Sequence, residues 1–336
     1  MRIKLGTVII FAVVVVAIIG GGAYLLTQSS DKSNTSANVV HTTTGSNANT
    51  TANNVVNINV AETIIVTNTS VVANTNTTAS NINTSTKNGV AILPESQRVS
   101  DTVSTLNIPV NVPTYDGKQY FVVGQPQGQN SKAIKKIIFS LPGHGTSAEK
   151  DYDAWKTSIT DNDYAIASLN WWDGGGETPG DYYTPQEVLN QITSYLIQQG
   201  YDDADFVVLE GFSRGSANTY AVKSYDVMSG TPVIDAVISA SGKYQVDFPL
   251  APNALTATTK LYNGVPWILA CGGKDDNPTR DGCIGMGETR TWLISEGANI
   301  LALLEDPNGG HGAFHSSPLK LVDQALSLLD ALPLAK

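Results

Sequence analysis

Short apolar runs alternate with longer amphipathic stretches along the last two thirds of the chain, and this alternation most constrains the fold. Runs rich in Ile, Val, Leu and Phe predict strands at 119–123, 134–141, 164–169, 206–209, 233–239, 265–270 and 300–304. Apolar residues at helical spacing predict helices at 185–198, through Ala217 and Val222, at 289–295 and at 319–332. Alternating strands and helices form βαβ units, so we expect an α/β fold with a mostly parallel central sheet flanked by helices.

The chain begins with a segment of another kind. Arg2 and Lys4 precede an apolar run, residues 5–26, that contains no charged side chain. A helix of this length can cross about 30 Å of hydrocarbon, so residues 1–26 are predicted to anchor the chain in a lipid bilayer. The positive-inside rule then places the rest of a single-pass membrane protein on the extracytoplasmic side. A cleaved signal peptide, giving a secreted protein, is the alternative; the run is longer than the usual apolar region of about 7–15 residues and no A-x-A site follows it.

Residues 27–90 change composition sharply. More than half of them are Ser, Thr or Asn, and none is aromatic or proline. Such a stretch buries too little apolar surface to offset its conformational entropy, which predicts a disordered linker. Apolar pairs such as Ile64-Ile65 and Val71-Val72 could instead form a few weak strands. The remaining residues, 91–336, are long enough for one large domain, which we call the head.

The charge of the chain limits its partners. Thirty Asp and Glu against 20 Lys and Arg give a net charge of -10, which argues against a nucleic-acid partner because phosphates require a basic face. The only two cysteines, Cys271 and Cys283, are predicted to form a disulfide if the head is exported. Cysteines and histidines do not occur at zinc-ligand spacing, so the sequence predicts neither a metal nor a cofactor.

The motif that points to chemistry follows the predicted strand at 206–209. Gly211, Ser213 and Gly215 form a G-x-S-x-G sequence between a strand and a helix. In that context the glycines allow a very tight turn, which holds the serine hydroxyl clear of the sheet at the start of the helix. Ser213 is therefore the candidate nucleophile.

A serine hydroxyl needs a base and an oriented acid. Of the three histidines in the head, His311 lies in a glycine-rich loop directly after the last predicted strand, so we favour it over His315. Asp275 follows the strand at 265–270 in a turn that presents it at the strand's carboxyl end, with Asp276 as the alternative acid. Nucleophile, acid and base would then lie on three separate loops, each of which follows a strand.

An acyl-transfer site also needs two N–H donors for the oxyanion of the tetrahedral intermediate. The loop at 142–146, Pro-Gly-His-Gly-Thr, follows the strand at 134–141 and supplies a glycine-rich bend. The main-chain N–H groups of Arg214 and Thr146 are the expected donors of this oxyanion hole. His144 is expected to shape the hole rather than to act as a second base.

With these motifs in order, the head resembles the α/β-hydrolase superfamily, in particular its serine esterases and lipases, over roughly residues 105–332. The resemblance implies that Ser213, Asp275 and His311 form a catalytic triad that works through an acyl-enzyme. Two features depart from the family. The segment between the strands at 233–239 and 265–270 is too short for a large helical lid, and Arg214 places a bulky base after the serine without an evident role.

Aromatic residues on a neighbouring loop are candidates for binding substrate. Trp171 and Trp172 follow the strand at 164–169 and could stack on a sugar ring or a phenolic acyl group, or could equally pack the edge of the sheet. The carboxylates of Asp173, Glu177 and Asp181 match no defined calcium loop, so we expect them to be solvated.

Three classes of function remain. The leading one is an extracytoplasmic serine hydrolase, carboxylesterase-like, that cleaves small-molecule or acylated-carbohydrate esters. A serine peptidase or acyltransferase on the same fold is the second, because the acyl-enzyme is common to all three. The third is a noncatalytic surface-binding protein.

Overall fold

The structure is a computed structural model of the 336-residue chain, and it describes residues 14–19, 22–27, 38–42, 86–87, 90–91, 93, 109–126, 135–161, 163–172, 178, 180–201, 204–245 and 260–333. The chain divides into two compact units, Met1–Glu62 and Thr63–Lys336. The predicted division at residues 26 and 90 stays a prediction, because most of the segment between those residues lies outside the described ranges.

Three strands make up the described part of the first unit: β1 (Val14–Ile19), β2 (Gly22–Thr27) and β3 (Asn38–Thr42), paired antiparallel in that order. Of the residues 5–26 that were expected to form a helix, the structure describes 14–19 and 22–26, and these lie in β1 and β2; residues 5–13, 20 and 21 are outside the described residues. A run of Val and Ile favours extended backbone, and three consecutive glycines at 20–22 disfavour a continuous helix. Among the described helices, none combines the length and the apolar character needed to cross a bilayer.

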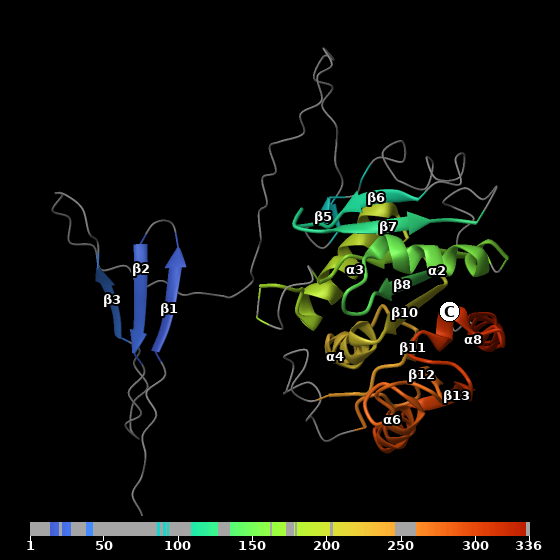
Figure 1. Cartoon of the computed structure of the whole chain (residues 1–336). Coiled ribbons are helices and arrows are strands. Elements are labelled where there is room, and N and C mark those ends of the chain that lie inside the picture. Colours follow the sequence, from blue (N-terminus) through green and yellow to red (C-terminus); the bar gives the residue numbers. More distant parts are fainter. Residues whose placement is uncertain are drawn as a thin grey trace, which may run out of the picture. The chain divides into compact units, whose positions relative to one another are not determined.

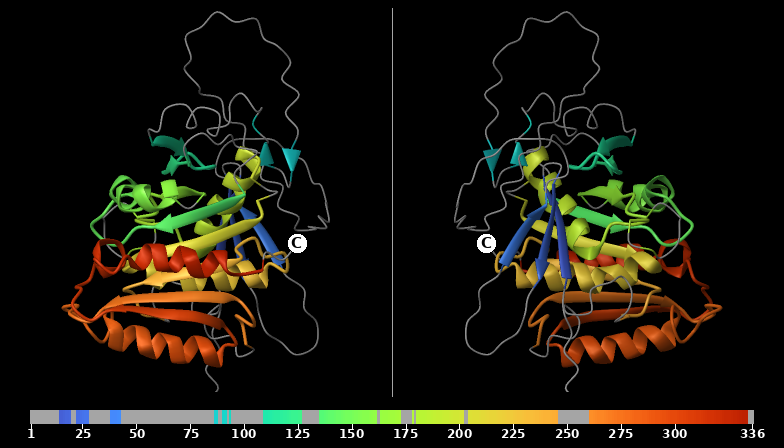
Figure 2. Two further views of the ribbon diagram at one scale, coloured as in Figure 1. Left: turned by 90° about the vertical axis from the view of Figure 1, so that its right-hand side faces the viewer. Right: turned by 90° about the vertical axis from the view of Figure 1, so that its left-hand side faces the viewer.

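The second unit is built on an eight-stranded sheet of strands β6 to β13, most of which are labelled in Figure 1. Its strands are β6 (Val110–Pro113), β7 (Tyr120–Gly124), β8 (Lys136–Leu141), β9 (Tyr164–Leu169), β10 (Phe206–Phe212), β11 (Ala236–Ala240), β12 (Pro266–Gly272) and β13 (Asn299–Asp306). The spatial order is β13-β12-β11-β10-β8-β9-β7-β6. Six neighbouring strands, β13 through β9, run parallel, and β6 and β7 add an antiparallel edge. The expected mostly parallel sheet is confirmed, and Figure 2 shows it from the side, with colour passing from teal at β6 to orange at β13.

Alternate residues of the strands enter two separate cores, because successive side chains of a strand point to opposite faces. Ile137 and Phe139 of β8 pack on one face with residues of α3 (Pro185–Gln199), α4 (Arg214–Met228) and α6 (Cys283–Ser295). Ile138 packs on the other face with α2 (Ala148–Asp161), α7 (Ala313–Ser316) and α8 (Leu321–Asp330). Both faces of the parallel strands β8 to β12 are thus covered, which accounts for their nearly continuous burial; the edge strand β13 is only partly buried.

Helix α3 shows why the sequence signals at its ends are informative. Thr184 caps its N-terminus, and the reciprocal bonds between Thr184 and Glu187 complete a capping box. Pro185 occupies the first turn, and Gly200 ends the helix at φ 71°, a conformation that favours glycine. The helix predicted at 185–198 is confirmed to within one residue.

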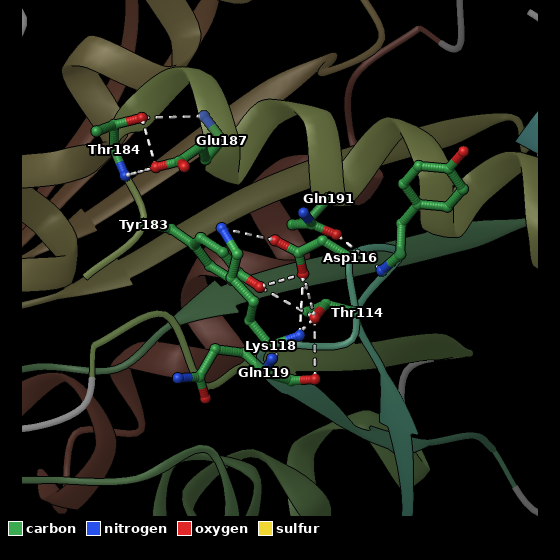
Figure 3. A network of polar contacts seen from close by, with 9 residues as sticks. Thr114, Asp116, Lys118, Gln119, Tyr183, Thr184, Glu187 and Gln191 are labelled. Atoms are coloured by element: carbon green, nitrogen blue, oxygen red, sulfur yellow. Dashed lines mark hydrogen bonds and ion pairs between the residues drawn. The ribbon is translucent and has the colours of Figure 1, made fainter. Parts of the chain in front are cut away.

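A polar network joins the β6–β7 hairpin to the region before α3 (Figure 3). The Tyr183 hydroxyl donates to Asp116 Oδ1 at 2.6 Å, and the Thr114 hydroxyl donates to the same oxygen at 2.9 Å. The Lys118 N–H contributes a third bond to it, and Gln191 of α3 accepts from the N–H of Tyr115. Together these bonds hold the pKa of Asp116 below its usual value, against the opposing effect of burial. The network fixes the hairpin on helix α3.

Candidate active site

Ser213 stands in the turn between β10 and α4, where the G-x-S-x-G motif placed it. Its backbone lies at φ 54° and ψ -114°, a region that residues with a side chain seldom occupy. The Ser213 N–H donates to Ala240 O on the neighbouring strand β11 at 2.8 Å, and Ser213 O accepts from Ala217 N in the first turn of α4. These bonds hold the strained turn from both sides.

Two glycines let backbone approach this turn closely. A Cβ built on Gly215 would lie 1.8 Å from Leu141 O, so helix α4 can start this close to β8 only with glycine there. A Cβ built on Gly143 would lie 2.8 Å from Ser213 Cβ. The loop after β8 therefore passes directly against the serine.

His311 reaches the serine from the loop between β13 and α7. Its Nε2 lies 2.9 Å from Ser213 Oγ, and its Nδ1 lies 2.8 Å from Asp275 Oδ2. An ionised carboxylate only accepts hydrogen bonds, so Nδ1 carries the proton and Nε2 of the neutral ring accepts from the serine hydroxyl. The His311 side chain is 40% exposed, whereas that of Asp275 is 2% exposed. Solvent and solutes can therefore reach His311 but not the carboxylate of Asp275.

Asp275 follows β12, and of the two aspartates that the sequence offered it is the one that contacts His311. Its Oδ1 accepts from the N–H of Asn277 at 2.8 Å, which fixes the carboxylate. Asp276 is exposed, and the described residues give it no bond to the histidine. His315, the alternative base, is not at the serine: it lies in α7, buried behind the ring of Phe212, with ring centroids 5.9 Å apart.

The acid turn and the histidine loop are tied to one another by backbone bonds. Gly273 N donates to Asp306 O at 2.8 Å, and Lys274 N donates to Gly309 O at 2.9 Å. The predicted disulfide is present, and it joins Cys271 at the end of β12 to Cys283 at the start of α6. Asp275 thus lies in a closed loop that is also anchored to the loop of its partner histidine.

The amides of Arg214 and Thr146, the two expected oxyanion donors, lie in different surroundings. Arg214 is the first residue of α4, so its amide lies at the positive end of the helix dipole, next to Ser213. The Thr146 N–H instead donates to Gly143 O at 3.3 Å, within its own loop. The choice of the second donor among the amides of this loop therefore stays a prediction. A glycine-rich loop could be located from sequence, but its bend could not.

The two tryptophans contact the loop that passes Ser213. Trp171 is fully buried, and its Nε1 donates to Pro142 O at 2.9 Å. Trp172 is 7% exposed and stacks on the exposed ring of His144, with centroids 4.7 Å apart. Both side chains therefore hold the loop that passes Ser213, and the fully buried Trp171 offers no face to a substrate. Asp173 and Glu177 lie outside the described residues.

Sequence reasoning missed two groups near the site. Asp281 is buried, and its carboxylate lies within 4.8 Å of ligand atoms of Asp275 and His311, while Arg280 pairs with it. The second group lies beneath the turn, where Glu210 of β10 and Asp151 of α2 are buried together. Desolvation raises the pKa of the Glu210 carboxyl well above its ordinary value, and it raises that of Asp151 to about 6. Burial also lowers the pKa of the adjacent His315 to about 4.

No family model matches this chain, and no curated protein matches its sequence. Solved structures do resemble it. A hyperthermophilic esterase from the archaeon Pyrobaculum calidifontis is 13% identical, with a TM-score of 0.53 over 70% of this chain and 90% of that one. A putative dienelactone hydrolase from Klebsiella pneumoniae is 14% identical, with a TM-score of 0.51 over 67% and 99%. The second unit has the α/β-hydrolase fold. In an α/β-hydrolase the nucleophile, acid and base follow three strands in that chain order, which is the order of Ser213, Asp275 and His311.

Proposed function

We propose that this chain is a serine hydrolase that cleaves carboxylic esters through an acyl-enzyme, with Ser213, His311 and Asp275 as its catalytic triad. The observation that carries the proposal is the unbroken chain of hydrogen bonds from Ser213 Oγ through His311 to Asp275 Oδ2. A serine alone is a poor nucleophile near neutral pH, and a base within hydrogen-bond reach that is itself oriented by a carboxylate is what activates it.

The reaction follows from the placement of these groups. Ser213 Oγ attacks the ester carbonyl carbon while its proton passes to His311 Nε2, and the carboxylate of Asp275 stabilises the imidazolium that forms. The tetrahedral intermediate collapses when the C–O bond to the alcohol breaks and Nε2 gives the proton to the leaving oxygen. Water then attacks the acyl-serine, gives a proton to Nε2, and releases the carboxylic acid as the proton returns to Ser213 Oγ.

Two main-chain amides are proposed to stabilise the oxyanion. The Arg214 N–H at the start of α4 is one, as the sequence suggested. We propose the His144 N–H in place of that of Thr146 as the second donor, because the residue before it, Gly143, lies against Ser213 and the Thr146 N–H is engaged with Gly143 O. Loss of one such donor typically raises the barrier by about 3 kcal/mol.

We further propose that the substrates are small or solvent-accessible esters, with acylated carbohydrates included. The exposed His311 side chain supports access from solvent. The connection between β11 and β12 runs only from Ser241 to Val265, which leaves no room for a large helical lid over an acyl-binding groove. The P. calidifontis protein is named an esterase and the K. pneumoniae protein a putative dienelactone hydrolase, and both names are consistent with ester substrates.

Export is proposed on separate grounds. The basic residues Arg2 and Lys4 before the uncharged run at 5–26, together with the disulfide, favour a head on the extracytoplasmic side, tethered to the membrane or secreted. Intact-mass analysis of the protein from membrane and medium fractions tests this. A full-length chain that resists carbonate extraction supports the tether, a shortened chain in the medium supports secretion, and a chain confined to the cytosol contradicts both.

The decisive test of the catalytic proposal is covalent labelling. The full-length chain is treated with a fluorophosphonate, and the adduct is located by peptide mass mapping. We expect one adduct, on Ser213, which is absent in Ser213→Ala and in His311→Ala. The matched pair Asp275→Asn and Asp276→Asn separates the two aspartates: labelling should slow strongly in the first and stay unchanged in the second.

Unlabelled protein from the same preparation then enters a comparison of substrates. Turnover of nitrophenyl esters in water supports the hydrolase, whereas turnover only of peptide amides, or only with an added alcohol acceptor, would move the assignment to a peptidase or an acyltransferase. A folded chain that takes no label at Ser213 contradicts the proposal and leaves the noncatalytic binding role.

A further inference from the structure

A second cluster of reactive side chains lies within the second unit, beneath the turn that carries Ser213. Five elements contribute to it: Ser140 from β8, Asp151 from α2, Ser168 from β9, Glu210 from β10 and His315 from α7. Except for His315, whose side chain is 12% exposed, these side chains belong to fully or almost fully buried residues. The proposed triad uses none of them.

Hydroxyl groups fix the two carboxylates of this cluster. Ser140 Oγ lies 2.5 Å from Asp151 Oδ2 and 2.5 Å from Glu210 Oε2, and Ser168 Oγ donates to Asp151 Oδ2 at 2.6 Å. Ser140 has one hydroxyl proton for two carboxyl contacts, so one of the two carboxyl groups must carry a proton when no cation is bound. Among the described residues, no Lys or Arg forms an ion pair with either carboxylate.

The remaining polar atoms of the cluster lie close to one another, and the Trp155 side chain interacts with the Glu210 carboxyl. Glu210 Oε1 and both ring nitrogens of His315 are buried and make no hydrogen bond in the described part of the chain. His315 Nε2 lies 3.9 Å from Glu210 Oε1, which is too long for a hydrogen bond. The buried Trp155 ring closes one side of the cluster and packs edge-on against His315, with centroids 5.5 Å apart. Buried polar groups of native proteins nearly always have a partner, so the two ring nitrogens of His315 indicate a missing ligand.

We propose that Asp151, Glu210 and His315 bind one divalent transition-metal ion of the Zn²⁺ type. One ligand atom from each residue lies within 4.8 Å of the others. Two ligand atoms that each lie about 2.1 Å from a tetrahedral ion are about 3.4 Å apart. Glu210 Oε1 and His315 Nε2 are 3.9 Å apart, so they need to approach each other by only about half an ångström to bind the same ion. Two carboxylates and one neutral imidazole balance the charge of a divalent ion, which a water molecule in the same place cannot do.

The donor set selects the kind of ion. Mg²⁺ and Ca²⁺ take oxygen ligands, while an imidazole nitrogen together with carboxylates suits Zn²⁺, Mn²⁺ or Co²⁺. The other group of this composition, Asp275, Asp281 and His311, is a weaker candidate. Arg280 already pairs with Asp281, and both ring nitrogens of His311 are hydrogen-bonded.

The ion would lie between two segments that flank the triad residues Ser213 and His311. Glu210 lies three residues before Ser213, and His315 lies four residues after His311. An ion held by both residues and by Asp151 links the strand that leads into the serine turn to the helix that follows the histidine loop. The ion acts as a positioning element and touches none of the reacting atoms.

The test uses the full-length chain, stripped with a chelator and then titrated with ZnCl2, MnCl2, CoCl2, CaCl2 or MgCl2 in separate samples. Metal content after desalting is measured by mass spectrometry, and thermal unfolding is followed in parallel. We expect about one equivalent of Zn²⁺ per chain and, at 100 times the dissociation constant, a rise in Tm of about 5–10 °C. Bound Co²⁺ should give a visible absorption band that reports nitrogen and oxygen ligands.

Variants locate the ion. His315→Gln and Asp151→Asn should lose both the bound metal and the Tm rise, whereas Asp153→Asn, an exposed aspartate on the same helix, should keep both. A wild-type chain that retains less than about a tenth of an equivalent and shows no Tm rise with any ion overturns the proposal, whatever the variants do. Metal that persists in His315→Gln but is lost in Asp281→Asn also overturns it, because the ion would then lie at the triad.

Discussion

Reduction of the Cys271–Cys283 disulfide should destabilise the domain without silencing its site. The bridge closes a loop with a sequence separation of 12 residues. In the chain-entropy treatment, a loop of this length restricts the unfolded chain enough to stabilise the folded state by about 3 kcal/mol at 25 °C. For a domain of roughly 250 residues this corresponds to a Tm lowered by about 6–12 °C.

The folded site should survive reduction because other bonds hold the acid turn. Gly273 N and Lys274 N remain bonded to the His311 loop, and the N–H of Asn277 remains bonded to the Asp275 carboxylate. We therefore expect kcat of ester hydrolysis at 25 °C to change by less than about threefold, while the free energy of unfolding falls by the full amount.

The assay is urea unfolding of the full-length chain with and without reductant, with thiol titration to confirm that the bridge is open and ester turnover measured on the same samples. The Cys271→Ala/Cys283→Ala double variant is the control, because reductant should not alter its unfolding. A loss smaller than about 1 kcal/mol on complete reduction would refute the loop-closure reasoning. A collapse of kcat without a loss of stability would show that the bridge acts on the geometry of Asp275 instead.

Three further outcomes are expected. Asp275→Asn should lower kcat/KM for a nitrophenyl ester by about 10³–10⁴-fold, with Asp276→Asn within twofold of wild type; equal losses would contradict the assignment of the acid. Gly215→Ala should cost at least about 3 kcal/mol in urea unfolding, since its methyl group would meet a β8 carbonyl at 1.8 Å, while Gly287→Ala, with open space on α6, should stabilise by about 0.5–1 kcal/mol. Asp116→Asn should cost at most about 1 kcal/mol at pH 7, because the carboxylate is partly exposed and screened. The pKa of Asp116 is lowered in the folded state, so its carboxylate stabilises the fold above about pH 4, and this stabilisation is lost as the pH falls through the pKa of the folded state. A difference in unfolding free energy between wild type and Asp116→Asn that does not change with pH would contradict this.

The sequence is most informative where local signals and burial agree. Strand β9 is predicted to the residue, and α3 to within one, because a continuous apolar run and apolar residues at helical spacing each report a local property. Helix α2 is missed although Tyr152, Trp155 and Ile159 form its buried stripe, since charged and polar residues dominate the rest of it. Strand β6 is missed because a short segment ending in Pro carries too little pattern.

Residues of the site divide in the same way. Ser213, Asp275 and His311 could be named because each follows a strand in a recognisable turn. Thr146 is favoured by its position in a loop whose bend depends on the contact between Gly143 and Ser213, which no local pattern reports. Glu210 and the residues around it come from five separate elements, so only the assembled sheet reveals them as one cluster.

The backbone of Ser213 has a consequence for anyone who tries to improve this protein. At φ 54° and ψ -114° a side chain costs about 1–3 kcal/mol that glycine avoids. A laboratory selection for thermostability alone would therefore favour glycine at this position and enrich variants that are thermostable but inactive. Any heat-resistance campaign must hold residue 213 fixed, or screen for turnover in every round.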